Sequence, residues 1–501
     1  MMQFRPVAVA LLCLLGACVT ASPPQSPATD PARASAAYVA RIDAIDDAGP
    51  RINAVITFDR GAAASSRAAA GTGPLNGRAI LIKDNIETRE WPTTAGSLAL
   101  AGNSTGRDAP LVARLRAAGG VVLGKTNLSE WANIRSNDST SGWSAVGGLT
   151  KNPHATDRNS CGSSSGSGAA VAAGLAWAAI GTETNGSITC PASVNGIVGF
   201  KPTVGLVSRT HVVPISATQD TAGPMARSVA DAALLLAAIA GSDPADTATA
   251  DADRFKTDFT RGLDTASLRE VRIGVLRKQV GGDPRVTALF DRSLRDLERA
   301  GAVLVDVDWA WPEGFWQRSL PVLLFELRRD LDAYLATLPG TAMPDTLADV
   351  VAFNRAHADV ELRWFNQDLF ERALTTADEG AYVTARDTNL KATREDGIDR
   401  LLRENRVAFL VAPTAGPAWV SDFIHGDNFP SRIGGGSLAA IAGYPHLTVP
   451  MGAVEGLPVG LSFMGGKWQD HAILQAGAAY ERARTAPLPE PSFKPWAPAA
   501  R

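Results

Sequence analysis

The sequence predicts an α/β fold, with a largely parallel β-sheet covered by helices on both faces. Three observations support this prediction. Strand-like and helix-like stretches alternate along the chain, which is the order expected when helices cross between parallel strands. The 501 residues are 45% hydrophobic and 20% charged, a globular composition that excludes disordered, collagen-like and coiled-coil chains. No internal repeat and no interior linker rich in proline and serine divides the chain, so we expect one large domain.

The first elements lie before residue 125. Residues 79–82 are an apolar, strand-like run. Asp108 can cap a helix that has Pro110 in its first turn and Gly119 at its C-terminal end. Residues 121–123 then predict a short buried strand.

The alternation of helices and strands continues in the middle of the chain. In chain order, we expect an apolar helix from Ser228 to near Gly241, a strand at 271–276, a helix from Asp283 to Gly301 and a strand at 303–305. The stretch from about 310 to 400 is more helical and more charged. We expect it to be an insertion or a lid.

The N-terminus has the pattern of an export signal. Arg5 precedes an apolar run at 7–15, which is too short for a membrane-spanning helix, because such a helix needs about 20 residues. Two cleavage patterns are open: a signal peptide at 1–21, or a lipoprotein signal at 1–17 that leaves Cys18 as the lipidated first residue. Either way we expect export to the periplasm, as a soluble protein or anchored to the membrane through Cys18.

The rest of the chain is expected to divide simply. A proline-rich tether at 22–33 precedes the folded domain at 34–490, and a tail at 491–501 follows it.

Charge and histidine content limit the classes of partner. The chain has 51 acidic and 48 basic residues and a formal charge of −3, so no basic surplus indicates nucleic acid. The six histidines are scattered without metal-ligand spacing. We expect no metal, no cofactor and no obligate protein partner.

The segment 119–126 matches the P-loop pattern G-x-x-x-x-G-K-[ST]. A phosphate cradle needs a strand before the glycines and a helix after the Lys-Thr pair. Here a helix comes before Gly119, and the four variable positions are themselves strand-like. We therefore expect no nucleotide site.

Two serine- and glycine-rich segments, 161–168 and 181–191, carry the candidate chemistry. Glycines beside a serine let backbone N–H groups converge on an oxyanion, but a hydroxyl nucleophile also needs a base. No histidine is near either segment in sequence, and G-x-S-x-G is absent, which disfavours a Ser-His-Asp hydrolase.

Lys83, at the end of the strand-like run, is a candidate base. Burial would lower its pKa and leave a neutral amine that accepts a proton. We expect Asp84 to point away from that amine, because strand neighbours alternate in direction. The competing interpretation is an exposed lysine at a strand end.

The motifs together resemble the amidase signature family of serine hydrolases, over about residues 36 to 485. The matching segments are 82–85, 124–130, 162–166, 181–191, 199–203, 220–225, 443–445 and 459–461. The resemblance implies a single large domain with a mixed, mostly parallel β-sheet surrounded by α-helices.

The resemblance also implies a Ser-Ser-Lys triad. Carried over by motif, Ser187 is the nucleophile, Ser163 the bridging serine after a cis peptide bond, and Lys83 the base. Backbone N–H groups around Thr184, Asn185 and Gly186 would hold the oxyanion. Two positions depart from the family pattern: Ser165 stands where glycine is frequent, and Asn185 stands where glycine or aspartate is common.

Within the family, the motifs around both serines look closest to bacterial peptide amidases, which hydrolyse the C-terminal amide of peptides. The implied substrate is a small peptide amide or another linear carboxamide. Three alternatives remain open: an amidase of broader aryl, fatty or aliphatic specificity, a protein like the amidase component of the tRNA-dependent amidotransferase, and a non-catalytic binding protein.

Cys161 and Cys190 flank the two serines, two residues before Ser163 and three after Ser187. We expect them to be two small buried apolar side chains. A disulfide is the alternative, because an exported protein meets an oxidising compartment. It requires Cα atoms within about 7 Å.

Overall fold

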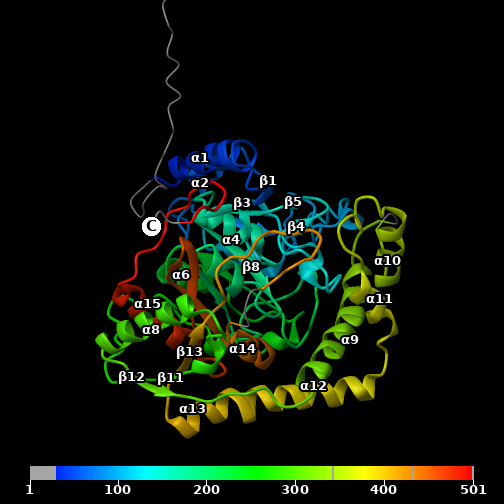
Figure 1. The fold of residues 1–501 in the computed structure, drawn as a ribbon. Helices are drawn as coiled ribbons and strands as arrows, with labels where there is room; N and C mark the ends of the chain where they lie inside the picture. The colour runs from blue at the N-terminus through cyan, green and yellow to red at the C-terminus, as the bar shows by residue number, and fades with distance from the viewer. Residues whose placement is uncertain (1–29, 341–342, 430–432, 499–501) are drawn as a thin grey trace, which may run out of the picture.

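The structure is a computed structural model that describes residues 30–340, 343–429 and 433–498. The predicted signal and Cys18 lie outside these residues. The core is a sheet of eleven strands in the order β1-β3-β2-β8-β10-β9-β14-β15-β13-β11-β12 (Figure 1). The strands are β1 Val55–Phe58, β2 Ala79–Lys83, β3 Val121–Thr126, β8 Ala178–Glu183, β9 Val198–Lys201, β10 Thr221–Ala226, β11 Arg272–Val275, β12 Val303–Asp306, β13 Phe409–Pro413, β14 His446–Val454 and β15 Leu457–Met464. Two small hairpins add β4 Trp143–Ser144 with β5 Gly148–Leu149, and β6 Lys151–Asn152 with β7 Ala155–Asn159.

The sheet is mixed, as predicted, but the expectation that it is mostly parallel is wrong. Among the described strands of this sheet, four pairs are parallel and six are antiparallel. The parallel pairs lie in two groups, β3-β2-β8 and β13-β11-β12. One cause is the β14–β15 hairpin, whose two-residue turn has φ of 52° at Glu455 and 79° at Gly456. Two positive φ angles are the geometry that joins antiparallel strands most tightly.

Helices cover both faces of the sheet, as predicted. Helices α6, α8 and α15 pack on one face, while α4, α5 and α14 pack on the other. Along β14 the side chains alternate accordingly: Leu447 contacts α15, and Thr448 faces the opposite way, toward Gly460. The helices outside the 310–400 stretch are α1 Pro31–Arg41, α2 Ala62–Ala69, α3 Pro110–Ala117, α4 Ser165–Ala172, α5 Thr189–Val194, α6 Val229–Ile239, α7 Ala252–Phe255, α8 Pro284–Arg299, α14 Gly436–Ala442 and α15 Asp470–Ala483.

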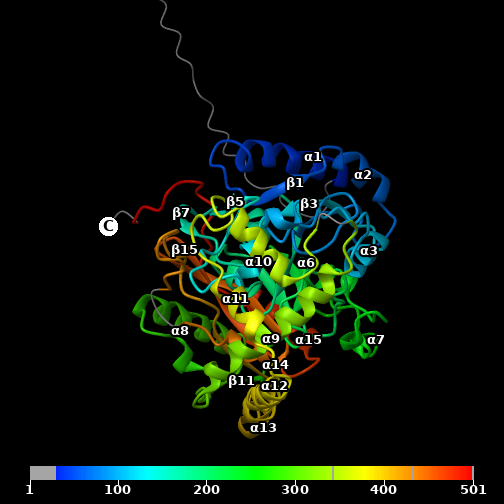
Figure 2. The same cartoon turned by 90° about the vertical axis from the view of Figure 1, so that its right-hand side faces the viewer.

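The stretch from 310 to 400 is helical, as expected, and stands along the right and lower edges of the molecule in Figure 1. Figure 2 shows α9, α10 and α11 facing the viewer. Its helices are α9 Phe315–Leu335, α10 Leu347–Ala356, α11 Asp368–Thr375, α12 Glu379–Thr393 and α13 Asp399–Asn405. Leu327, Leu331 and Phe370 of this stretch share one buried cluster with Trp131 and Val213 of the main domain. The insertion is therefore fastened to the domain by apolar packing.

Local capping agrees with most expected element ends. Ser228 caps α6 and Asp283 caps α8 through their side chains. The cap predicted for α3 is wrong: Ala109 occupies that position, and the carboxylate of Asp108 instead binds Arg116 at 2.9 Å. Helix α1 begins at Pro31, so the last three residues of the predicted tether are helical.

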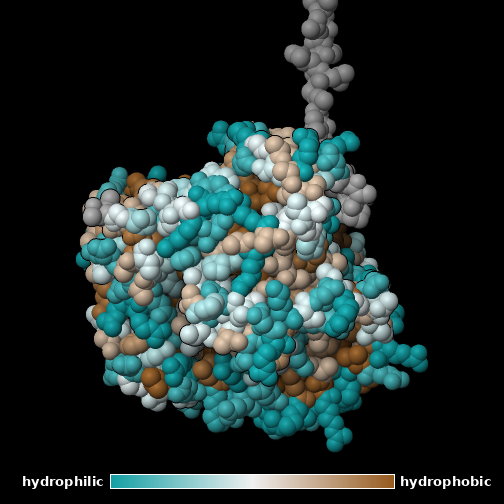
Figure 3. All heavy atoms as spheres, turned by 180° about the vertical axis from the view of Figure 1, so that it is seen from behind, coloured by the Kyte–Doolittle hydropathy of each residue, from teal (hydrophilic) through white to brown (hydrophobic). Residues whose placement is uncertain are grey.

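The surface seen from behind is largely hydrophilic, with hydrophobic groups in separate small patches (Figure 3). Within the three described ranges, no helix combines the length and apolar character needed to cross a bilayer.

Candidate active site

Lys83 ends β2, the third strand from one edge of the sheet, and its side chain is fully buried. Its Nζ lies 2.7 Å from Ser163 Oγ, 2.8 Å from Thr182 Oγ1 and 3.3 Å from the carbonyl oxygen of Thr182. The structure therefore places the buried Lys83 amine beside the Ser163 hydroxyl, and the alternative of an exposed lysine at a strand end is excluded.

Ser163 is held immediately before α4, after a cis Gly162–Ser163 peptide bond. The close packing explains the glycine: a Cβ added at Gly162 would lie 2.1 Å from Ser129 Oγ. The carbonyl of Ser163 accepts a hydrogen bond from the N–H of Ser129 at 3.0 Å. These contacts hold the Ser163 hydroxyl toward Lys83.

Ser187 lies in the turn between β8 and α5 and is only half-buried. Its carbonyl accepts a hydrogen bond from the N–H of Ser164 at 3.1 Å. The two serine-rich segments, 24 residues apart in sequence at Ser163 and Ser187, therefore lie side by side. The structure brings Lys83, Ser163 and the Ser187 turn into one place.

The turn before Ser187 presents free backbone donors. Gly186 has a φ of 86°, a conformation that favours glycine. Within the described part of the chain, the N–H groups of Asn185, Gly186 and Ser187 donate no hydrogen bond to another residue. The Asn185 side chain accepts a hydrogen bond from Ser437 Oγ at 3.0 Å. The free donors suit an oxyanion.

Glu183 fixes the other side of this turn. Its carboxylate is buried and accepts hydrogen bonds from the N–H groups of Ile188 at 2.8 Å and Thr189 at 3.0 Å. A carboxylate at the start of a helix satisfies donors that the helix leaves unpaired. Glu183 therefore does not occupy the N–H groups of Asn185 and Gly186, which can bind a ligand.

Burial of Lys83 lowers its pKa from 10.5 to about 7, while the negative charges of Asp220 and Glu183 oppose the shift. Lys125, the neighbouring buried lysine, differs because its Nζ lies 2.9 Å from the Asp84 carboxylate. Asp84 is thus engaged by Lys125 and not by Lys83, as strand alternation predicts. Among the described residues no carboxylate forms an ion pair with Lys83, so its amine can be neutral near pH 7.

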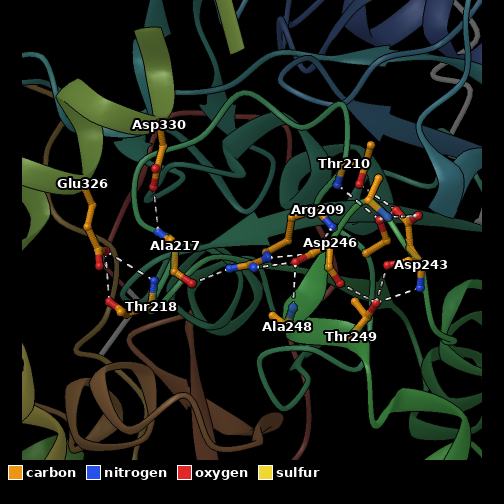
Figure 4. Close-up of polar contacts among 12 residues, drawn as sticks. Arg209, Thr210, Ala217, Thr218, Asp243, Asp246, Ala248, Thr249, Glu326 and Asp330 are labelled. Carbon is orange, nitrogen blue, oxygen red and sulfur yellow. Dashed lines mark hydrogen bonds and ion pairs between the residues drawn. The ribbon is translucent and has the colours of Figure 1, made fainter. Parts of the chain in front are cut away.

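A cavity of about 380 Å³ is lined by Thr182, the residue whose hydroxyl contacts Lys83. Its inner end includes Asn85 and Thr182, and the Asn85 amide donates to Thr182 Oγ1 at 3.0 Å. Its walls are loop 209–221 and helix α9. Figure 4 shows that this loop is tied down on both sides: Arg209 forms a bidentate pair with Asp246, and Ala217 N–H donates to Asp330 of α9 at 3.2 Å.

Three residues beside the predicted set were not assigned a role from the sequence. Thr182 contacts Lys83 directly, Glu183 holds the start of α5, and Asp220 raises the pKa of Lys83. Thr182 and Glu183 lie in the recognised segment 181–191, and their alternation on a strand could have placed one of them toward Lys83.

Other sequence expectations are settled by the same region. Gly124, Lys125 and Thr126 lie in β3, which confirms that 119–126 is not a phosphate loop. Cys161 and Cys190 form a disulfide with Cα atoms 6.0 Å apart, so the expectation of two unpaired buried side chains is wrong. The adjacency of the two serine segments brings the cysteines within bonding distance, which sequence spacing alone does not show. The described residues include no group of three or more His, Cys, Asp or Glu placed to hold a metal ion.

Comparison with known proteins gives consistent matches. The family model described as Amidase matches residues 35–474. The native peptide amidase from Stenotrophomonas maltophilia has a structure similar to this one, with a TM-score of 0.86 and 47% identity over 93% of this chain and 96% of that chain. A probable amidase of Arabidopsis thaliana is 38% identical over 82% of this chain and 77% of its own length. A putative amidase of Schizosaccharomyces pombe is 35% identical over 82% of this chain and 74% of its own length. A glutamyl-tRNA(Gln) amidotransferase chain of Burkholderia pseudomallei is 34% identical over 91% of this chain and 94% of its own length.

Proposed function

The chain belongs to the amidase signature family, and from this premise we propose that it hydrolyses the C-terminal amide of peptides through a Ser187-Ser163-Lys83 triad. The observation that carries the proposal is the buried Lys83 amine, 2.7 Å from Ser163 Oγ, with its pKa lowered to about 7. A neutral amine in that position is a base, and the half-buried Ser187 beside it is open to substrate.

The reaction follows from the order of these groups. Lys83 takes the proton of Ser163 while Ser163 takes that of Ser187, and Ser187 Oγ forms a bond to the amide carbon. The free backbone N–H groups of the turn, those of Asn185 and Gly186 among the expected set, hold the negative oxygen. The proton returns through Ser163 to the leaving nitrogen, the C–N bond breaks and ammonia departs. Water then cleaves the acyl ester, giving the peptide acid and free Ser187.

Two comparisons favour a peptide amide over other linear amides. Identity is 47% with the peptide amidase of Stenotrophomonas maltophilia and 34% with the amidotransferase chain. The export signal predicted at 1–21 also argues against a component of a tRNA-dependent amidotransferase. An amidase acting more broadly on aryl, fatty or aliphatic amides is the second candidate, because the probable amidase of Arabidopsis thaliana, 38% identical, has a name that specifies no substrate.

We also propose that the protein is exported to the periplasm, either soluble or anchored through a lipidated Cys18. The sequence at 1–21 supports this proposal, and so does the Cys161–Cys190 disulfide, because disulfides persist in oxidising compartments. Fractionation of cells, with labelled-palmitate incorporation measured in wild type and Cys18→Ala, tests both alternatives.

The substrate proposal is tested by ammonia release from an acetylated tripeptide amide by the purified protein. Fatty, anilide and short aliphatic amides are compared at equal concentration, with Ser187→Ala as the inactive control. We expect the highest kcat/KM for the peptide amide. A higher kcat/KM for a fatty, anilide or aliphatic amide would replace the peptide assignment, and no hydrolysis of any amide would favour a non-catalytic binding protein.

A further inference from the structure

The Cys161–Cys190 disulfide joins the two segments that carry the serines. Cys161 precedes Ser163 by two residues, and Cys190 is the second residue of α5, three after Ser187. The bond therefore connects the chain entering Ser163 to the helix leaving Ser187, across 29 residues of sequence.

Each cysteine is fixed by its own backbone contacts. The N–H of Cys161 donates to Asn159 Oδ1 at 2.7 Å, and its carbonyl accepts from Ser165 Oγ at 2.6 Å. The N–H of Cys190 donates to the carbonyl of Gly186 at 2.8 Å, in the turn before Ser187. Movement of the Cys161 sulfur would therefore displace the backbone next to Ser163, and movement of the Cys190 sulfur would displace the backbone next to Ser187.

Hydrogen bonds also tie these two segments together. Ser164 N–H donates to the Ser187 carbonyl at 3.1 Å, and Ser164 Oγ donates to the Thr182 carbonyl at 3.0 Å and accepts from the Thr182 N–H at 3.2 Å. The Asn195 side chain, at the end of α5, donates to the Ser160 carbonyl at 3.0 Å. Each hydrogen bond contributes about 1 kcal/mol to stability. The disulfide is the covalent link among these contacts.

The surroundings of the disulfide leave it open to a small reagent. Its neighbours form a small apolar cluster, Val194, Ala418 and Trp419, separate from the main core. Cys161 is buried but Cys190 is only half-buried. Cys190 is therefore the side from which a soluble reductant would approach the bond.

We propose that Cys161 and Cys190 are positioning residues for the amidase reaction, and that their disulfide sets the placement of Ser187 relative to Ser163. This inference rests on the proposed function. Breaking the bond frees α5 to move against the segment at 161–163, and displacements of about 1 Å in a catalytic group can cost about 100-fold in rate. Turnover then depends on the oxidation state of this pair.

The test uses the full-length protein with and without a water-soluble phosphine. The phosphine donates two electrons, the S–S bond breaks, each sulfur takes a proton, and the phosphine oxide takes its oxygen from water. In thiol titration of the denatured protein, reduction should release two more thiols in wild type than in the double variant Cys161→Ala with Cys190→Ala. We expect kcat for the peptide amide to fall about 10- to 100-fold with KM within about twofold, and to return on reoxidation.

A double variant and a packing control separate positioning from stability. Cys161→Ala with Cys190→Ala should reproduce the low kcat and be insensitive to phosphine. Val194→Ala removes packing from the same cluster but keeps the disulfide, so its kcat should stay within about twofold of wild type. A folded, reduced protein with normal kcat would overturn the proposal. Loss of far-UV circular dichroism on reduction would also overturn it, because the bond would then serve the fold as a whole.

A second measurement distinguishes failure of the disulfide proposal from failure of the proposed function. A fluorophosphonate phosphonylates a reactive serine with loss of fluoride and needs no amide substrate. If the oxidised protein releases no ammonia from the peptide amide, the proposed substrate is wrong, and the labelling rate of Ser187 before and after reduction still tests the role of the disulfide. Equal labelling rates in both states would overturn it.

Discussion

Replacing Asp220 by Asn should move the acid limb of the kcat/KM profile to lower pH. Asp220 is the leading charge that raises the pKa of Lys83 against the effect of burial. Its carboxylate accepts hydrogen bonds from Thr184 Oγ1 at 2.6 Å and from the N–H groups of Ile215 at 2.7 Å and Ser216 at 2.8 Å. An Asn side chain keeps an acceptor for the two N–H groups and removes the charge.

The size of the wild-type effect follows from the structure. Lowering the pKa of Lys83 from 10.5 to about 7 is a change of about 3.5 units, or about 5 kcal/mol. At pH 7 about half of the amine is then neutral, compared with about 1 in 3000 for an unshifted lysine. The wild-type kcat/KM should rise from mildly acid pH and level off near pH 8, because the free enzyme must lose one proton.

The assay is ammonia release from the peptide amide at low substrate concentration between pH 5 and 10. Burial raises the pKa of Asp220 itself to about 6, so the wild-type limb reports a coupled pair, whereas Asp220→Asn should show a single ionisation at lower pH. A limb that moves to higher pH in Asp220→Asn would refute the charge argument. A wild-type profile still climbing with unit slope beyond pH 9 would show that Lys83 does not act as a base with a lowered pKa.

Three further predictions concern the triad and its cost. Ser187→Ala should abolish turnover without unfolding the protein, Lys83→Ala should be nearly as severe, and Ser163→Ala should be less severe. The effects of double variants should be far from additive, because the three groups act as a unit. Normal turnover in Ser187→Ala would show that Ser187 is not the nucleophile. Lys83→Met should raise the free energy of unfolding at pH 6 by about 2–5 kcal/mol. Between pH 7 and 10.5 the lysine is protonated in the unfolded chain but neutral in the folded one, so the stability of the wild type rises with pH. Urea melts should therefore show that the gain from Lys83→Met becomes smaller as pH rises from 7 to 10.5. A gain that grows with pH would contradict the sign. Chelator treatment should leave turnover unchanged, and loss of activity restored by zinc would overturn the serine mechanism.

The candidate triad was accessible from the sequence because its motifs carry local constraints. Gly162 must be glycine because a Cβ there would meet Ser129 Oγ, and Gly186 adopts a positive φ before Ser187. Such requirements leave glycines at fixed distances from the serines. Lys83 was assigned through the family resemblance, since the apolar run before it is equally compatible with an exposed lysine at a strand end.

The sequence by itself therefore determined the α/β class, the helical stretch at 310–400, the family and the three candidate residues, all of which depend on composition or on short segments. Tertiary structure alone decided the balance of parallel and antiparallel pairs, the Thr182 contact to Lys83 and the Cys161–Cys190 disulfide. Strand pairing, the Thr182 contact and the disulfide all depend on contacts between residues that are far apart in the chain. Periodicity shows which face of an element is buried, but which elements become neighbours is set by the packing of the whole domain.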